Sequence, residues 1–143
     1  MKSLRNIVLS IMAAATLNMM GCVQQPIQGE KQKLIFQVSD NDPKKWNLTL
    51  NNVKNVQHDI GKDNVDIEVV AYGPGIGMLK LDSEVGNRIT EVVGSGVKVV
   101  ACENTMHGQK LTKEDMLPNI DYVKAGVVEL MQKQHEGYAY VRP

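Results

Sequence analysis

Cys102 is the residue whose type and position best suit chemistry in this chain. It follows the β-branched run at 97–101 and precedes the polar segment 103–108. A thiol reacts as its thiolate, and nearby positive charge or a helix N-terminus raises the thiolate fraction. His107 is close enough in sequence to act as a base or proton relay, as in Cys–His pairs. The competing interpretations are a packed, inert cysteine and a solvated surface histidine.

A second set of candidates follows the expected strands and could line a rim or bind an anion: Asp40, Asn41, Gly73, Gly75, Gly77 and Asn104. Backbone amides in the glycine-rich segment 73–77 can cradle a negative charge. The segment matches neither the Walker pattern nor GxGxxG, so a plain tight turn competes with this interpretation. The histidines lack the spacing of zinc ligands, and we predict neither a metal nor a cofactor.

These candidates must be positioned by elements that alternate between strand and helix. Strands are expected at 33–38, 66–72, 97–101, 122–124 and 138–141. Helices between successive strands imply right-handed crossovers and a mainly parallel sheet. The predicted fold is therefore α/β, a three-layer α/β/α sandwich with a sheet of about five strands. The carboxyl ends of its strands would bring the candidate residues to one rim.

The first two helices have recognisable ends. Asp42 can cap a helix, Pro43 tolerates its first position, and Gly61 suits its end. The second helix is expected to begin at Asp82 or Ser83. These caps explain Asp42 without a functional role.

The second half of the chain contains a loop, a short helix and a longer one. The segment 102–108 is expected to be a loop, and Thr112 with Asp115 resembles a capping box. A last helix is expected at 127–135. This helix carries more apolar residues than one small core needs, and exposed apolar patches mark contacts with other molecules. The residues concerned are Val127, Val128 and Met131.

Composition narrows the classes of protein. The chain has 143 residues, 43% of them hydrophobic, which suits one ordinary domain with a core. Its 16 basic and 16 acidic residues balance, so the chain lacks the excess positive charge of a nucleic-acid binder. Two cysteines cannot build a disulfide-rich scaffold or a four-cysteine zinc site.

The N-terminus predicts an export signal at 1–21. Lys2 and Arg5 precede an apolar run at 7–20, which is too short to span a bilayer comfortably. A buried first helix is the alternative, but such helices are amphipathic, and this run is apolar all round.

The end of the leader resembles a bacterial lipobox. Gly21 precedes Cys22, which would be lipidated and become the new N-terminus. Residues 22–32 would then form a tether and residues 33–143 the domain. Val23 after the cysteine resembles outer-membrane sorting, so we expect a periplasmic, lipid-anchored protein. Ordinary cleavage near 13–15 is the alternative.

The segment 96–106 (GVKVVACENTM) resembles the DsrE/DsrF-like family, in which such a run leads into a loop and a helix. The segment 127–143 also resembles the C-terminal helix and strand of that family, and the resemblance covers residues 33–143. It implies a compact α/β sandwich that often forms trimers or hexamers. It further implies that Cys102 accepts a sulfur atom as a persulfide and passes it to a partner.

The sequence therefore predicts a sulfur carrier or sulfurtransferase-like protein that uses Cys102, with a thiol acceptor protein as partner. Two alternatives stay open. The first is a non-enzymatic ligand-binding or assembly module anchored to the membrane. The second is a redox sensor in which Cys102 forms a sulfenic acid or an intermolecular disulfide.

Overall fold

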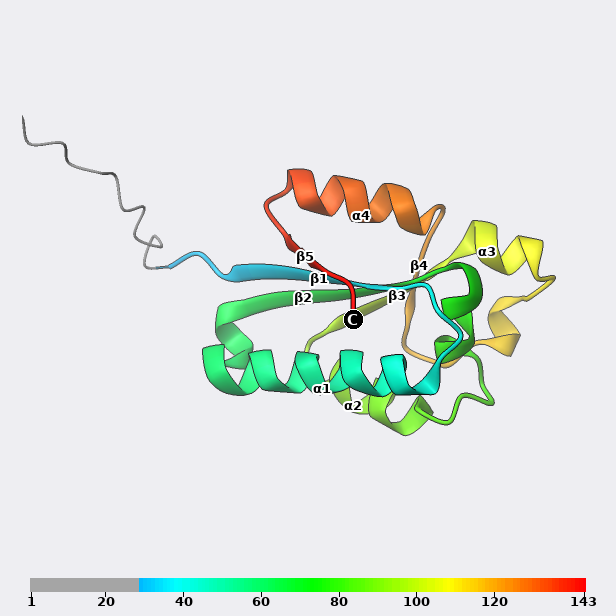
Figure 1. Cartoon of the computed structure of the whole chain (residues 1–143), viewed down its shortest axis with the longest axis horizontal. Coiled ribbons are helices and arrows are strands. Elements are labelled where there is room, and N and C mark those ends of the chain that lie inside the picture. The colour runs from blue at the N-terminus through cyan, green and yellow to red at the C-terminus, as the bar shows by residue number, and fades with distance from the viewer. Residues whose placement is uncertain (1–28) are drawn as a thin grey trace, which may run out of the picture.

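The computed structural model describes residues 29–143, which form a five-stranded sheet in the order β4-β3-β2-β1-β5 (Figure 1). Every neighbouring pair is parallel. The strands are β1 (Gln32–Val38), β2 (Val65–Ala71), β3 (Lys98–Cys102), β4 (Asp121–Val123) and β5 (Ala139–Val141). The predicted α/β class and five-strand count are confirmed, and each strand lies within a residue or two of its expected position.

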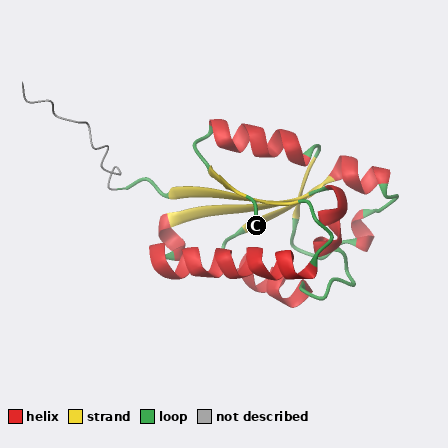
Figure 2. Cartoon of the chain, viewed as in Figure 1, coloured by secondary structure: helices red, strands yellow, loops and turns green. Residues whose placement is uncertain are grey.

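Helices cover both faces of the sheet (Figures 1 and 2). One face is covered by α1 (Pro43–Ile60) and α2 (Gly86–Gly94), and the other by α4 (Gly126–His135). The main core lies under α1 and α2, where alternate strand residues such as Phe36, Val69 and Val99 point. The core under α4 is much smaller and contains Ile35, Val70, Val100 and Leu130.

The first helix begins and ends as its sequence predicts. The Asp42 side chain accepts a hydrogen bond from the Lys44 backbone N–H at 2.9 Å, and Pro43 occupies the first turn. Gly61 ends the helix with a φ of 90°, a conformation that side chains rarely adopt. Trp46, packed into the core, donates its indole N–H to the Asp40 carbonyl.

Two boundaries differ from the sequence prediction. The segment 103–108 is a short helix, α3 (Glu103–Gly108), because Met106 packs into the main core and holds the turn there. The helix α2 begins at Gly86 because the preceding residues form turns, with Ser83 N–H bonded to Lys80 and Gly86 N–H bonded to Ser83.

Short 3₁₀ turns complete the chain: η1 (Lys62–Asn64), η2 (Gly73–Leu79) and η3 (Lys113–Asp115). The predicted capping box is confirmed, because the Asp115 carboxylate accepts the Thr112 backbone N–H at 2.8 Å. Within residues 29–143 no helix has the length and apolar character needed to cross a bilayer. The predicted signal and Cys22 lie outside the described residues.

Candidate functional site

Cys102 lies at the carboxyl end of β3 and is 5% exposed. Successive strand residues alternate between faces, so Cys102 lies on the same face as Lys98 and Val100, the face covered by α4. Its sulfur accepts a hydrogen bond from the Gly126 backbone N–H at 3.3 Å. The Lys124 carbonyl is 4.0 Å from the same sulfur. The thiol is therefore held between the end of β3 and the start of α4.

Hydrogen bonds to the sulfur favour the thiolate. Burial raises the pKa of the Cys102 thiol, but the Thr105 hydroxyl and the backbone amides of Gly126, Thr105 and Asn104 lower it more. The net pKa lies below the ordinary value for a thiol. Since the thiolate is the nucleophile, this arrangement increases the reactive fraction near neutral pH.

Gly73 fixes the orientation of the Thr105 hydroxyl. The Gly73 backbone N–H donates to Thr105 Oγ1 at 2.9 Å, so this oxygen acts as the acceptor for Gly73. A hydroxyl carries one proton, which remains free to be donated to the Cys102 sulfur. Gln109 in turn donates to the Gly73 carbonyl at 3.2 Å. The glycine-rich segment therefore acts on the thiol through Thr105.

His107 is exposed on α3. The Cys102 sulfur instead accepts a hydrogen bond from the Gly126 N–H, and Thr105 and Asn104 help to lower the pKa of the thiol. A role for His107 as base or relay stays a prediction.

The expected rim divides into two regions. Gly73 and Asn104 lie beside Cys102, as described above. Asn41 and Gly77 line a separate cavity of about 250 Å³ together with Trp46. Asp40, also on this second side, forms ion pairs with Lys45 at 3.0 Å and with Arg142 at 3.3 Å. The Lys45 hydrogen bond is the main reason that the pKa of Asp40 lies below its usual value.

The glycines at 73–77 have structural uses. A Cβ on Gly75 would lie 2.3 Å from the Val38 carbonyl oxygen, so only glycine allows η2 to approach the end of β1 so closely. The Gly73 and Gly75 amides already donate to Thr105 and to the Tyr72 carbonyl. These bonds favour the tight-turn interpretation over an anion cradle.

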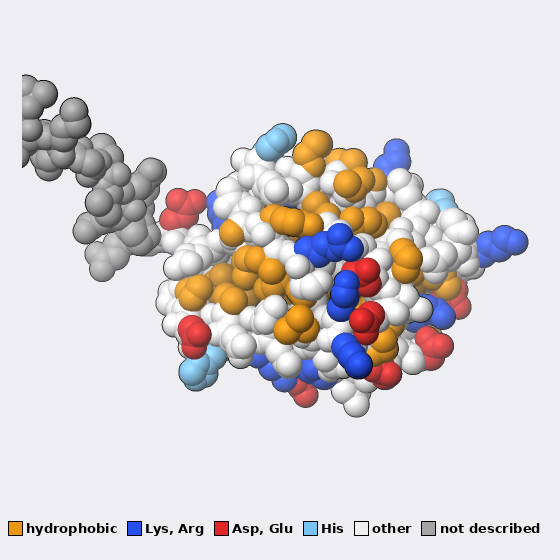
Figure 3. Space-filling view, viewed as in Figure 1, with side chains coloured by type: hydrophobic (Ala, Val, Ile, Leu, Met, Phe, Trp, Pro, Cys, Tyr) orange, Lys and Arg blue, Asp and Glu red, His pale blue; other side chains and the backbone are white. Residues whose placement is uncertain are grey.

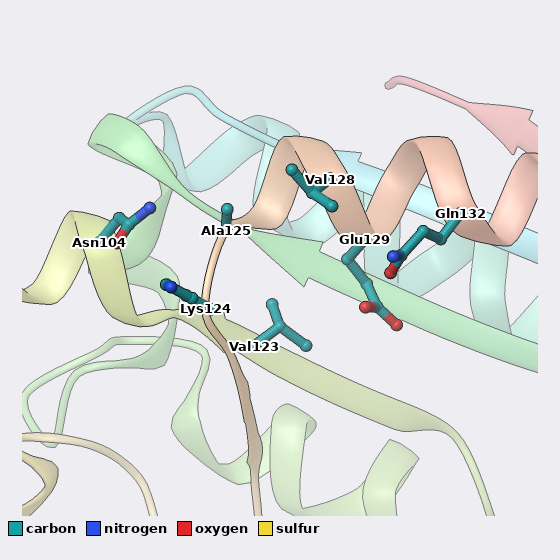
Figure 4. Close-up of a pocket in the computed structure, with 7 residues that line it drawn as sticks. All are labelled: Asn104, Val123, Lys124, Ala125, Val128, Glu129 and Gln132. Carbon is teal, nitrogen blue, oxygen red and sulfur yellow. The ribbon is translucent and has the colours of Figure 1, made fainter.

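A cavity of about 420 Å³ opens between α4, the end of β4 and the start of α3 (Figure 4). We call it the Cys102 cavity. Cys102 is not one of the lining residues, but the wall includes Lys124, whose carbonyl is 4.0 Å from the sulfur, and Ala125, which precedes Gly126. Its other lining residues include Asn104, Val123, Val128, Glu129 and Gln132. This size suits a small organic ligand.

A buried carboxyl group lies on the same face of the sheet. Glu68 of β2 is 2% exposed, and it pairs in register with Lys98 of β3. Burial, opposed by Lys98 and reinforced by Glu129, raises the pKa of Glu68 to about 7. Sequence reasoning missed this residue, although a charged side chain in the middle of a strand covered on both faces is itself a signal.

No group of three or more metal-ligating side chains occurs within residues 29–143. Cys102 is the free cysteine of this part of the chain.

The chain forms a small α/β domain with an all-parallel five-stranded sheet, and Cys102 lies at the carboxyl end of β3. The chain belongs to the DsrE/DsrF-like family, whose model matches residues 32–143. The predicted family is therefore confirmed.

Solved structures share this fold. MTH1491, a protein of unknown function from Methanobacterium thermoautotrophicum, is 35% identical and has a TM-score of 0.75, with 79% of this chain and 100% of that chain covered. BT1422 from Bacteroides thetaiotaomicron, also of unknown function, is 15% identical and has a TM-score of 0.65, with 78% of this chain and 95% of that chain covered. The ychN protein from E. coli is 12% identical and has a TM-score of 0.63, with 78% of this chain and 99% of that chain covered. A search of curated proteins found no match to this chain.

Proposed function

We propose that the protein carries sulfur as a persulfide on Cys102. The observation that carries this proposal is the set of hydrogen-bond donors around the Cys102 sulfur, which lowers the thiol pKa despite burial. Membership of the DsrE/DsrF-like family supports it. The adjoining cavity offers space for a small sulfur donor.

The chemistry is a thiol–disulfide-type exchange. The Cys102 thiolate attacks the outer sulfur of a donor persulfide, R–S–SH. A new sulfur–sulfur bond forms at Cys102, the donor's sulfur–sulfur bond breaks, and the thiolate R–S⁻ leaves and takes a proton from water. An acceptor thiolate then attacks the outer sulfur on Cys102 and releases the Cys102 thiolate. The Gly126 amide, 3.3 Å from the sulfur, is placed to stabilise this leaving thiolate.

Persulfide loading tests the proposal directly. The purified protein would carry Cys22→Ala, which leaves Cys102 as the single cysteine of the chain. After exposure to inorganic polysulfide, intact mass spectrometry should show a gain of one sulfur that a reductant removes. Cys102→Ser should show no gain. An unmodified Cys102 that small reagents still alkylate would refute sulfur carriage.

The low exposure of Cys102 supports a second candidate function, a binding module whose cysteine is structural. In that case a ligand would stabilise the protein against heat equally well in the wild type and in Cys102→Ser. Loading that depends on Cys102 would exclude this alternative as the main function.

We further propose, on the leader sequence, that the protein is exported and anchored to the membrane through a lipid on Cys22. Fractionation of cells should then place the wild type with membranes and Cys22→Ala in the soluble periplasmic fraction. A wild type that fractionates as soluble would contradict the anchor. A thiol protein in the same compartment is the proposed acceptor of the sulfur.

A further inference from the structure

The Cys102 cavity carries opposite charges on its two sides (Figure 4). Lys124 and Asn104 lie on the side next to α3, where the Cys102 sulfur is held. Glu129 and Gln132 project from α4 on the other side. Apolar side chains, including Val123 and Val128, line the space between. A ligand with an anionic end and a cationic end would match both sides.

A buried group reinforces the negative side. The Glu68 side chain is 3% exposed, and its Oε2 lies 3.5 Å from Lys98 Nζ. Its Oε1 is buried and has no hydrogen-bond partner among residues 29–143. Glu129 contacts the same Lys98 ammonium at 4.0 Å and interacts directly with Glu68. Glu68 and Glu129 form what we call the carboxyl pair.

One nearby lysine does not balance two carboxylates. With both groups ionised, the carboxyl pair needs another positive charge or proton, because two carboxylates in one partly buried site repel each other. Lys133 of α4 contributes only at longer range and is itself paired with Glu136 at 2.8 Å. Since Glu129 lines the cavity, a ligand ammonium bound there would supply the missing charge.

We propose that the Cys102 cavity binds an amine-bearing, low-molecular-weight persulfide, with its ammonium at Glu129 and its sulfur end towards Lys124 and Cys102. This inference rests on the proposed function for its sulfur chemistry. Lys124 attracts the acidic persulfide end, which reacts in its protonated S–SH form, and Glu129, backed by Glu68, selects a donor that carries an amine. The Cys102 thiolate attacks the outer sulfur, and the corresponding aminothiolate leaves and takes a proton from water.

An ammonium at Glu129 is attracted more strongly when the neighbouring Glu68 is ionised. The charged groups that face Glu68 are Lys98 on β3 and Glu129 and Lys133 on α4. Protonation of Glu68 at low pH would remove one of the two negative charges that attract the ligand's ammonium. Selection for the amine should therefore increase as the pH rises from 6 to 8.

The experiment compares two donors of similar length. The persulfides of cysteamine and of 3-mercaptopropionate are each made from the matching disulfide and sulfide. Rates of Cys102 loading are measured in a Cys22→Ala background, where Cys102 is the single cysteine. Intact mass spectrometry distinguishes the persulfide product from a mixed disulfide. The readout is the ratio of the two rates within each variant, divided by the ratio measured for the same donors with free N-acetylcysteine, because the two leaving thiols differ in pKa. The wild type should favour the cysteamine donor by roughly five- to ten-fold, as expected for one charge-assisted hydrogen bond.

Glu129→Gln should reduce this ratio to about one. Glu91→Gln, on α2 at the opposite face of the sheet, is the matched control and should retain the wild-type ratio. A normalised ratio of about one in the wild type would overturn the inference and leave the proposed function standing. A preference for the amine that persists in Glu129→Gln would also overturn it.

A second measurement separates the cavity from the sulfur chemistry. In Cys102→Ser, calorimetry would measure binding of 2-(methylthio)ethylamine, which carries the ammonium but no transferable sulfur. Glu129→Gln should weaken its binding by roughly five- to ten-fold. If no donor loads Cys102 but this amine binds through Glu129, the proposed function fails and the binding site stands. If the amine does not bind, the inference fails.

Discussion

The Thr105 hydroxyl accepts the Gly73 amide at 2.9 Å and helps to lower the pKa of the Cys102 thiol. Thr105→Val removes the donor while keeping the volume of the side chain. The thiol pKa should therefore rise, and alkylation by iodoacetamide at pH 7 should slow several-fold. Thr105→Ser keeps the hydroxyl and serves as the control. A pH profile of alkylation that is identical in all three proteins would contradict this role for Thr105.

The raised pKa of Glu68 makes folding stability depend on pH. Glu68 has a pKa of about 7 in the folded state and an ordinary value of 4.5, so the folded protein binds the extra proton between these pH values. Stability from this group is therefore greatest at low pH and falls as the pH rises through about 7. A shift from 4.5 to about 7, in which the attraction of Lys98 is already included, corresponds to a loss of about 3 kcal/mol.

Glu68→Gln removes that titration. Relative to the wild type, the variant should gain stability as the pH rises from 5 to 8, because its amide stays neutral and can donate to Glu129. Urea unfolding at several pH values measures the difference between the two proteins. A difference that is constant across this range would show that Glu68 keeps an ordinary pKa.

At the scale of elements, the start of α4 determines the geometry around the thiol. A Cβ on Gly126 would lie 3.0 Å from Tyr72 Cβ and 3.2 Å from Val70 Cγ1, so the helix packs closely on β2 only with glycine there. Gly126→Ala should destabilise the protein by about 1–2 kcal/mol through overpacking. It should also slow Cys102 alkylation, because the Gly126 amide moves away from the sulfur.

A matched control for Gly126→Ala exists in α2. Gly94 is also helical, but a Cβ there would meet nothing within 4 Å. Gly94→Ala should therefore stabilise the protein by roughly 0.5 kcal/mol and leave alkylation unchanged. Thermal unfolding and alkylation rates together test both substitutions. Equal effects of the two substitutions would mean that close packing of α4 is unimportant.

The sequence predicts elements well where apolar periodicity is strong. The β-branched strands and α1, with its Asp42 cap and Gly61 end, follow from local pattern alone. The segment 103–108 carries only Met106 as an apolar anchor, so its helix depends on tertiary packing and was wrongly predicted as a loop.

The candidate site was predictable only in part. Cys102 at a strand end follows from sequence, because a strand run stops there. The Thr105 hydroxyl and the Gly126 amide were not identified as neighbours of the Cys102 sulfur. They reach it through the tertiary arrangement of α3 and α4, which local sequence pattern does not encode. Glu68 was missed because strand alternation does not reveal which face will be covered by α4.

At the scale of the whole molecule, α4 leaves apolar side chains exposed near β5 (Figure 3). Val127 is 62% exposed and Met131 50%, one helical turn apart. Homo-oligomerisation, expected from the sequence, stays a prediction. Sedimentation velocity should show an oligomer that Val127→Lys with Met131→Lys dissociates, whereas Gln134→Lys on the same helix should not. A wild type that stays monomeric at high concentration would contradict it.

The parallel sheet gives the domain a direction. The chain enters β1 at Gln32, and a strand of seven residues is about 23 Å long. Cys102 lies at the other end of the strands, where β3 ends and α3 begins (Figure 1). If the protein is attached to a surface through the chain that enters β1, the length of the strands therefore separates that surface from the Cys102 thiol. A protein immobilised in this way would hold the Cys102 end of its sheet away from the surface.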